Sequence, residues 1–161
     1  MRFKNRKWMF LILLIIILDQ VVKWLVADNL SSTDSIVVIP HILSFIYVKN
    51  TGAAFSIFSD KTVVLGIVSI LFCIAVTVYW YIKKPKSELL KLSLSLLLAG
   101  AVGNAIDRIA RGFVVDFIET TFIKFPVFNI ADISITFGTV FLMIYLLFFD
   151  KDGNKNGEDS N

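Results

Sequence analysis

The sequence predicts an all-α membrane protein with four transmembrane helices, both termini cytoplasmic, and a small extracytoplasmic β-strand element between the first and second helices. Composition is the first reason: of 161 residues, 57% are hydrophobic and 18% are charged, and the mean hydropathy is +0.77. These values lie outside the usual range of a soluble domain of this length. The second reason is four apolar runs, each long enough to cross a hydrocarbon core of about 30 Å. The third is that lysine and arginine gather at the N-terminus and in the second connection, which the positive-inside rule places in the cytoplasm.

The first predicted helix covers residues 8 to about 27 and follows a basic N-terminus, an arrangement that resembles a secretory signal peptide. Cleavage is not expected, because the run continues through Asp19 and Lys23 at helical spacing instead of ending in small residues. These two side chains share a helix face and could fix a loop or a substrate group over a site. The simpler alternative is a mutually neutralising pair near the outer interface, with Lys23 snorkelling to the headgroups.

Residues 29–60 form a mixed segment rich in β-branched and aromatic residues, which predicts the strand element. Within it, Asn50 and Gly52 belong to the run NTGAAFS, where small residues would let another chain approach closely. The alternative is an ordinary turn, because Asn-x-Gly alone is a weak signal.

Three further spans are predicted at residues 62–82, 89–106 and 133–149. A lysine cluster follows the second span, which places that connection in the cytoplasm and the two long connections, 29–60 and 108–132, together on the outer side. We expect residues 1–150 to form a single integral-membrane domain. The polar tail, 151–161, is predicted to be a disordered cytoplasmic extension.

A dense polar cluster lies between the third and fourth spans, from residue 103 to residue 132. Its polar members are Asn104, Asp107, Arg108, Arg111, Asp116, Glu119, Asn129 and Asp132. Such groups are costly to place at a bilayer boundary, so the cluster is interpreted as functional.

Each member of the cluster also has a plain structural explanation. Asn129 and Asp132, just before the fourth span, could be a helix N-cap and an acid in the first turn. Arg108 could clamp a carbonyl or a lipid phosphate, or it could simply close the third helix together with Asp107. A purely structural explanation fits Asp116 least well, because Asp116 interrupts an apolar, β-favouring stretch.

Asp116 and Asp132 at the two ends of one connection could form a catalytic dyad. Two carboxylates held close together cannot easily both ionise, so one would serve as acid while the other activates water. Spacing alone does not establish that they meet. Such chemistry needs no cofactor and no metal, and the lone Cys73 and lone His41 predict neither a disulfide nor a metal site. The basic residues lie beside apolar runs, so nucleic-acid binding is not expected.

Five motifs resemble, in order and spacing, those of bacterial lipoprotein signal peptidase, also called signal peptidase II. They are Asp19-Gln20-x-x-Lys23, Asn50-x-Gly-Ala-Ala-Phe, Gly103-Asn104-x-x-Asp107-Arg108, Val115-Asp116-Phe and Phe128-Asn129-x-Ala-Asp132. The resemblance covers nearly the whole chain from the first span to the fourth. Ile133 departs from the family pattern, in which a small polar residue is expected after the aspartate.

The resemblance implies a membrane aspartyl endopeptidase that removes the signal peptide of prolipoproteins N-terminal to a diacylglyceryl-modified cysteine. It implies that Asp116 and Asp132 are catalytic, that the outer strand segment receives the substrate, and that the inhibitor globomycin binds at the dyad. The implied substrate-binding and supporting residues are Asp19, Lys23, Asn50, Gly52, Asn104, Asp107, Arg108 and Asn129. The expected partners are lipidated prolipoproteins and membrane lipids, the expected state is a monomer, and the expected location is the bacterial cytoplasmic membrane with the site at its outer face.

The sequence leaves three other functions open. A small proton- or ion-coupled transporter also carries intramembrane acids, but here the acids gather at one surface. A presenilin-like or prepilin-peptidase-like protease would need a Gly-x-Gly-Asp motif, which is absent from the sequence. A membrane scaffold without catalytic activity is the remaining alternative.

Overall fold

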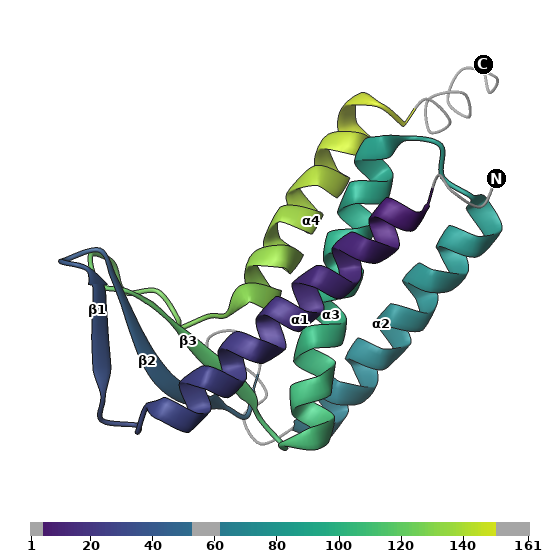
Figure 1. Ribbon diagram of the computed structural model, residues 1–161. Coiled ribbons are helices and arrows are strands. Elements are labelled where there is room, and N and C mark those ends of the chain that lie inside the picture. Colours follow the sequence, from purple (N-terminus) through teal and green to yellow (C-terminus); the bar gives the residue numbers. More distant parts are fainter. Residues whose placement is uncertain (1–4, 53–61, 151–161) are drawn as a thin grey trace, which may run out of the picture.

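Four long helices form the body of the protein. The computed structural model describes residues 5–52 and 62–150. The helices are α1 (Arg6–Asn29), α2 (Thr62–Lys83), α3 (Glu88–Ala110) and α4 (Ile130–Phe148), and each is long and apolar enough to cross a membrane. The four predicted spans are therefore confirmed as helices. Helix α1 begins and α4 ends at the same end of the bundle (Figure 1), an arrangement in keeping with an even number of crossings.

Two helix boundaries differ from the predicted ones in ways that affect the polar cluster. Helix α3 continues to Ala110, beyond the end of the predicted span at residue 106, and so includes Asp107 and Arg108, in agreement with the interpretation that these residues close the third helix. Helix α4 begins at Ile130 instead of residue 133, which places Asp132 in its first turn. Each extension contains ionisable residues, Asp107 and Arg108 in α3 and Asp132 in α4, which lower the local hydropathy and hide the true ends of the helices.

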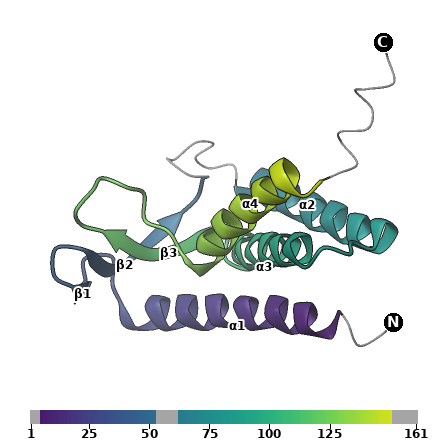
Figure 2. The same cartoon turned by 90° about the horizontal axis from the view of Figure 1, so that it is seen from above.

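Helix α3 is the central helix of the bundle. In its most apolar stretch 67% of the residues are buried, compared with 11% to 17% in the other three helices. Helix α1 lies on one side of α3, and α2 and α4 lie on the other (Figure 2). The α3–α4 contact is close because of glycines: a Cβ at Gly100 would lie 2.3 Å from the Ala131 carbonyl oxygen, and a Cβ at Gly138 would lie 2.9 Å from Leu97.

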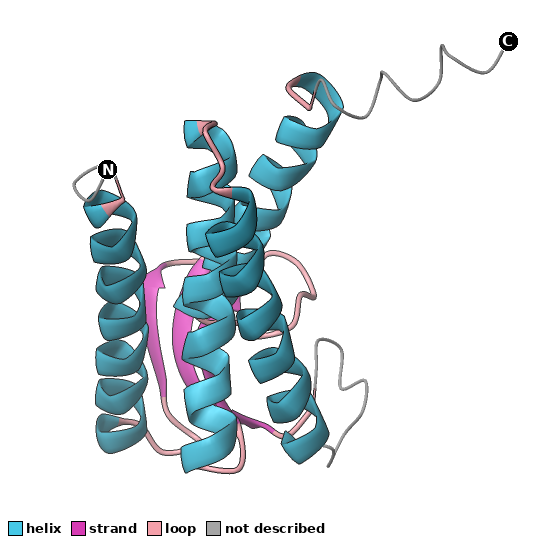
Figure 3. Ribbon diagram, turned by 90° about the vertical axis from the view of Figure 1, so that its right-hand side faces the viewer, coloured by secondary structure: helices cyan, strands magenta, loops and turns pink. Residues whose placement is uncertain are grey.

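Three antiparallel strands form a sheet at one end of the bundle (Figure 3). Strands β1 (Ser35–Ile39) and β2 (Leu43–Asn50) come from the connection between α1 and α2, as predicted. Strand β3 (Val114–Thr120) comes from the connection between α3 and α4 and pairs with β2. The prediction of a strand element confined to the first connection was therefore incomplete.

The sheet is attached to the bundle by a small apolar core. Val115, Phe117 and Ile118 of β3 are buried together with Val26, near the end of α1. The Phe117 ring packs edge-to-face on Phe45 of β2, with 5.7 Å between the ring centroids. Burial of the apolar face of β3 explains why this stretch adds to the sheet, and it holds Asp116 at the junction of sheet and helices.

The predictions for residues 53–61 and for the tail at 151–161 fall outside the described residues. The first range contains the Ala-Ala-Phe part of the second motif. Ile133, which departs from the family pattern, packs against the apolar core of the sheet, and its N–H donates to the Asn129 carbonyl oxygen at 3.2 Å.

Candidate active site

Asp116 is held on β3 by two side-chain amides. Its Cα pairs with that of Val48 in β2, and its side chain is almost fully buried, with 2% of the residue exposed. Asn50 Nδ2 donates to Asp116 Oδ2 at 2.8 Å, and Asn129 Nδ2 donates to Asp116 Oδ1 at 2.7 Å. Asn50 is itself fixed by the N–H of Gly52, which donates to Asn50 Oδ1 at 2.9 Å. The turn residues of the second motif thus orient an amide on Asp116.

Asp132 is held at the start of α4 by a capping box. The Asp132 N–H donates to Asn129 Oδ1 at 2.9 Å, and the Asn129 N–H donates to Asp132 Oδ2 at 3.1 Å. The structural alternative for these residues, an N-cap with an acid in the first turn, is therefore correct. It does not exclude a chemical role, because Asn129 contacts both aspartates. The two carboxylates at opposite ends of the connection meet around this one asparagine.

Asn104 links Asp132 to the interior of the bundle. Asn104 Nδ2 donates to Asp132 Oδ1 at 2.8 Å. Asn104 Oδ1 accepts from Lys23 Nζ at 3.0 Å and from Asn129 Nδ2 at 3.2 Å. Each polar atom of this buried side chain is therefore used, as is expected of an amide in a low-dielectric site.

Lys23 lies at the centre of a buried ion network. Its Nζ is 2.9 Å from Asp19 Oδ2 and 3.0 Å from Asp107 Oδ2, and all three side chains are at most 1% exposed. The expectation that Lys23 snorkels to the interface is wrong. The second carboxylate, from α3, and the Asn104 amide satisfy the ammonium group inside the protein, so it has no need to reach water.

Arg108 is the predicted site residue with the loosest contacts. Its Nη1 donates to Ser69 Oγ at 3.5 Å, and its Nε is buried without a partner among the described residues. The carboxylates of Asp107, Asp116 and Asp132 all lie within its electrostatic range. Arg108 does stand in the last turn of α3, as the structural alternative expects, whereas Asp107 faces the buried network instead.

Burial gives Asp116 an unusual proton affinity. The pKa of Asp116 is raised to about 6, mainly because the carboxyl group is removed from water and also because the Asp132 charge is near, and this rise outweighs the lowering by the hydrogen bonds from Asn50 and Asn129. A carboxyl group with this pKa can exchange a proton near neutral pH, which is what general acid–base chemistry requires.

Two residues of the network were not singled out as site residues from the sequence. Gln20 Nε2 donates to Asp19 Oδ2 at 3.2 Å, to the Gly103 carbonyl oxygen at 3.1 Å and to Asp107 Oδ1 at 3.4 Å. Arg111 Nη1 donates to Asp107 Oδ1 at 3.1 Å. The four-residue spacing of Asp107 and Arg111 was the available signal for the second contact.

No group of three or more His, Cys, Asp or Glu side chains that could hold a metal ion occurs among residues 5–52 and 62–150. The oxygen atoms of Asp116 and Asp132 are instead engaged by amide donors. Four carboxylates, four side-chain amides and three cations are thus brought together at this end of the bundle: Asp19, Asp107, Asp116 and Asp132; Gln20, Asn50, Asn104 and Asn129; and Lys23, Arg108 and Arg111.

Comparison with known proteins places this geometry in a family. Residues 11–148 match the family model described as Signal peptidase (SPase) II. The chain is 41% identical over 165 residues to a lipoprotein signal peptidase of Acinetobacter baumannii, covering 96% of this chain and 90% of that relative. It is 45% identical over 136 residues to one of Staphylococcus aureus, covering 83% of each.

A solved structure gives the same result. A bacterial membrane enzyme determined by the in meso method at 2.3 Å resolution superimposes with a TM-score of 0.86 and is 35% identical, covering 98% of this chain and 95% of that one. A second, determined by the same method at 1.9 Å, gives a TM-score of 0.82 at 38% identity. The shared fold, the matched length and the sequence identity agree: the chain is a multi-pass membrane protein that belongs to the signal peptidase II family of aspartic endopeptidases.

Proposed function

We propose that this protein cleaves the signal peptide from diacylglyceryl-modified prolipoproteins, N-terminal to the lipidated cysteine, and that Asp116 and Asp132 are its catalytic pair. The observation that carries the assignment is Asn129, whose Nδ2 contacts Asp116 at 2.7 Å while its backbone N–H contacts Asp132 at 3.1 Å. Family membership supports the reaction, and this shared asparagine supports the choice of residues.

The chemistry needs one proton and one water shared between the two carboxylates. The ionised carboxylate takes a proton from water as the water oxygen bonds to the scissile carbonyl carbon, and the protonated carboxylate gives its proton to the carbonyl oxygen. Collapse of the tetrahedral intermediate breaks the C–N bond, and a proton passes to the leaving nitrogen. The products are a carboxyl end on the signal peptide and a free amine on the lipidated cysteine.

The surrounding residues have roles that follow from their contacts. Asn50 and Asn129 orient Asp116, and Asn104 orients Asp132, so the amides keep the two carboxylates from turning toward solvent. The half-buried Arg108 guanidinium, with its Nε unpaired among the described residues, is available to polarise a substrate carbonyl or to bind a lipid ester. The enzyme would act as a monomer and would be blocked by globomycin bound at the dyad.

The experiment that tests the catalytic pair is cleavage of a diacylglyceryl-modified prolipoprotein by Asp116→Asn and Asp132→Asn. We expect each variant to insert normally and to lose activity by roughly three orders of magnitude or more, because neither amide can exchange a proton in water attack. Glu119→Gln, which removes a carboxylate from the same strand but outside the hydrogen-bonded site, is the matched control and should cleave normally. Substantial cleavage by either Asp→Asn variant would remove that residue from the catalytic pair.

We also propose that the sheet end of the bundle faces outward, with both termini cytoplasmic. Lys83, the last residue of α2, and Lys84 and Lys86 just beyond it lie at the opposite end of the bundle and support this orientation through the positive-inside rule. A variant lacking Cys73 and carrying Ser32→Cys should react with a membrane-impermeant thiol reagent in intact cells, and one carrying Lys86→Cys only after permeabilisation. The reverse pattern would overturn the orientation and leave the catalytic assignment standing.

A further inference from the structure

Asp107 makes four contacts from a fully buried position, and one of them reaches the backbone of the catalytic strand. Its Oδ2 accepts from Lys23 Nζ at 3.0 Å and from the backbone N–H of Val115 at 3.2 Å. Its Oδ1 accepts from Arg111 Nη1 at 3.1 Å and from Gln20 Nε2 at 3.4 Å. Val115 is the residue directly before Asp116, so Asp107 holds the strand at the point where the catalytic side chain leaves it.

Asp19 holds the other aspartate in the same way. Asp19 Oδ1 accepts from the backbone N–H of Ala131 at 2.9 Å, and Ala131 is the residue directly before Asp132. Each buried carboxylate therefore fixes the peptide N–H that precedes one member of the proposed catalytic pair. Lys23 joins the two anchors, at 2.9 Å from one and 3.0 Å from the other.

The charges of this arrangement need a second cation. Two buried carboxylates share one lysine, which would leave a negative charge beside the reacting groups. Arg111, the C-cap residue that follows α3, pairs with Asp107 and keeps 27% of its side chain exposed to solvent. The four charged groups are then balanced, and only Arg111 of the four reaches water.

We propose that Arg111 is a further positioning residue of this peptidase, which balances the charge of Asp107 and aims that carboxylate at the Val115 N–H, thereby holding β3 and Asp116 in place. Arg111 does not touch the substrate in this role. The inference rests on the proposed function, because it takes Asp116 as catalytic and reads kcat, KM and the pH profile from peptide cleavage; only the exchange measurement is independent of activity.

The expected effect on the pH–activity profile depends on the charged groups around Asp107 and around the catalytic pair. Asp107 faces Lys23 and Asp19 from α1 and Arg111 from the C-cap of its own helix. The catalytic pair faces Lys23 and Arg108 as its nearby cations. Removing Arg111 adds an uncompensated negative charge near that pair, which favours the protonated form of the neighbouring carboxylates.

The test compares Arg111→Gln with Arg111→Lys, using Lys124→Gln as a control that removes an exposed cation from the loop after β3. For Arg111→Gln we expect kcat to fall roughly tenfold with KM within about twofold, because the reacting groups are misplaced while substrate contacts remain. The acidic limb of the pH–activity profile should move to higher pH, and amide exchange in the peptide covering β3 should quicken. Arg111→Lys should restore most of the activity, since a lysine at this spacing still reaches the carboxylate.

A double variant separates charge balance from a substrate contact. Asp107→Asn combined with Arg111→Gln removes both charges, so its acidic limb should return to the wild-type position. A raised KM with unchanged kcat in Arg111→Gln would assign Arg111 to substrate binding instead, and unchanged kcat, pH profile and exchange would also overturn the proposal.

Two further controls keep the test decisive. Arg111→Gln alone could fail to accumulate in the membrane. In that case, a double variant that accumulates and has the acidic limb of its pH–activity profile at the wild-type position supports the proposal. If neither variant accumulates, the proposal is overturned. Cleavage by the wild type but not by Asp116→Asn establishes the proposed function independently of Arg111, and the exchange measurement does not require activity at all.

Discussion

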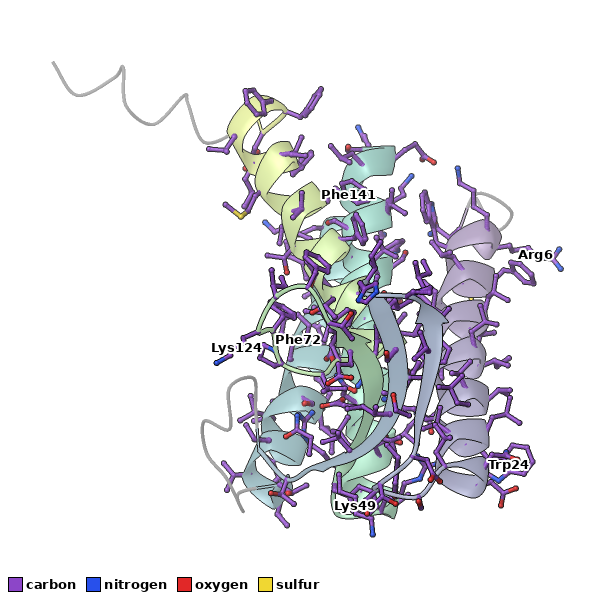
Figure 4. All side chains as sticks on the ribbon, turned by 90° about the vertical axis from the view of Figure 1, so that its left-hand side faces the viewer. Arg6, Trp24, Lys49, Phe72, Lys124 and Phe141 are labelled. Atoms are coloured by element: carbon purple, nitrogen blue, oxygen red, sulfur yellow. The ribbon has the colours of Figure 1, made fainter. Side chains whose placement is uncertain are left out.

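The two ends of the bundle both join α1 to α3 by ion pairs, but they do so in opposite environments. At the sheet end, Lys23 is enclosed with Asp19 and Asp107, and none of the three is more than 1% exposed. At the other end, Lys7 pairs with Glu88 at 2.5 Å, and these side chains are 62% and 49% exposed. Arg6 and Trp24, labelled in Figure 4, mark these two ends of α1.

The difference shows which ion pairs determine geometry. An exposed ion pair contributes little to stability, because each charged group is solvated by water almost as well as it is stabilised by its partner. A buried group has no such replacement, so each oxygen must be met by a donor from the protein. Asp19 and Asp107 meet this requirement partly with backbone N–H groups of α4 and β3, and these contacts make the sheet-end network a positioning device.

Among substitutions at the two ends of the bundle, Lys23→Met is expected to cause the largest loss of stability and cleavage. The substitution keeps the length of the side chain but leaves two carboxylates buried without their shared cation, a loss of about 3 to 5 kcal/mol of stability. We expect reduced thermal stability in detergent, measured by unfolding monitored through circular dichroism, and loss of cleavage in the protein that remains folded.

Lys91→Met is the matched control for that variant. Lys91 is also buried, with 5% of its side chain exposed, but its partner Glu88 is half exposed and can be hydrated once the lysine is gone. Its effect should be clearly smaller than that of Lys23→Met. Equal losses of thermal stability in the two variants would mean that the stability depends on burial of the lysine side chain and not on whether its carboxylate partners are shielded from water.

A smaller effect is expected from Gly103→Ala, which acts on one anchor only. A Cβ at this position would lie 2.7 Å from Asp19 Oδ2 and 3.2 Å from the Ala131 Cβ. Asp19 must then shift away from the Ala131 N–H, so we expect cleavage to fall by about tenfold to a hundredfold as Asp132 loses its position. Gly66→Ala in α2 is the control, because its nearest neighbour is the Arg108 Cβ at an ordinary 3.5 Å. Similar losses in both would refute a specific role for the Asp19 anchor.

The helices could be predicted from hydropathy because an apolar run of about 20 residues has few alternatives to a transmembrane helix. The polar cluster could be located for the same reason, since ionisable groups stand out in so apolar a chain. Hydropathy alone misplaced the ends of α3 and α4, because ionisable residues such as Asp107 and Asp132 lie in their terminal turns, whereas the capping pattern that begins at Asn129 did indicate the start of α4.

The proximity of Asp116 and Asp132 could not be predicted from the sequence pattern alone. It depends on β3 pairing with β2 from a different connection, and on Asn129 serving Asp132 as an N-cap while it donates to Asp116. The contact of Asp19 with the Ala131 N–H joins residues 112 positions apart. Local periodicity carries no information on such pairs, and the ordered motifs predicted the participants without predicting which atoms touch.

The smallest effect is expected at the far end of the bundle, from Lys7→Gln. Lys7 Nζ lies 4.7 Å from the centre of the Trp8 ring and also pairs with Glu88, so Lys7 has two partners, compared with three for Lys23. Its exposure lets water replace both contacts, and Glu88 keeps Lys91 at 2.7 Å as a second partner. We expect thermal stability and cleavage to match the wild type within experimental error. A loss comparable to that of Gly103→Ala would mean that the two ends are coupled through α1, and that the positioning network extends along the whole helix.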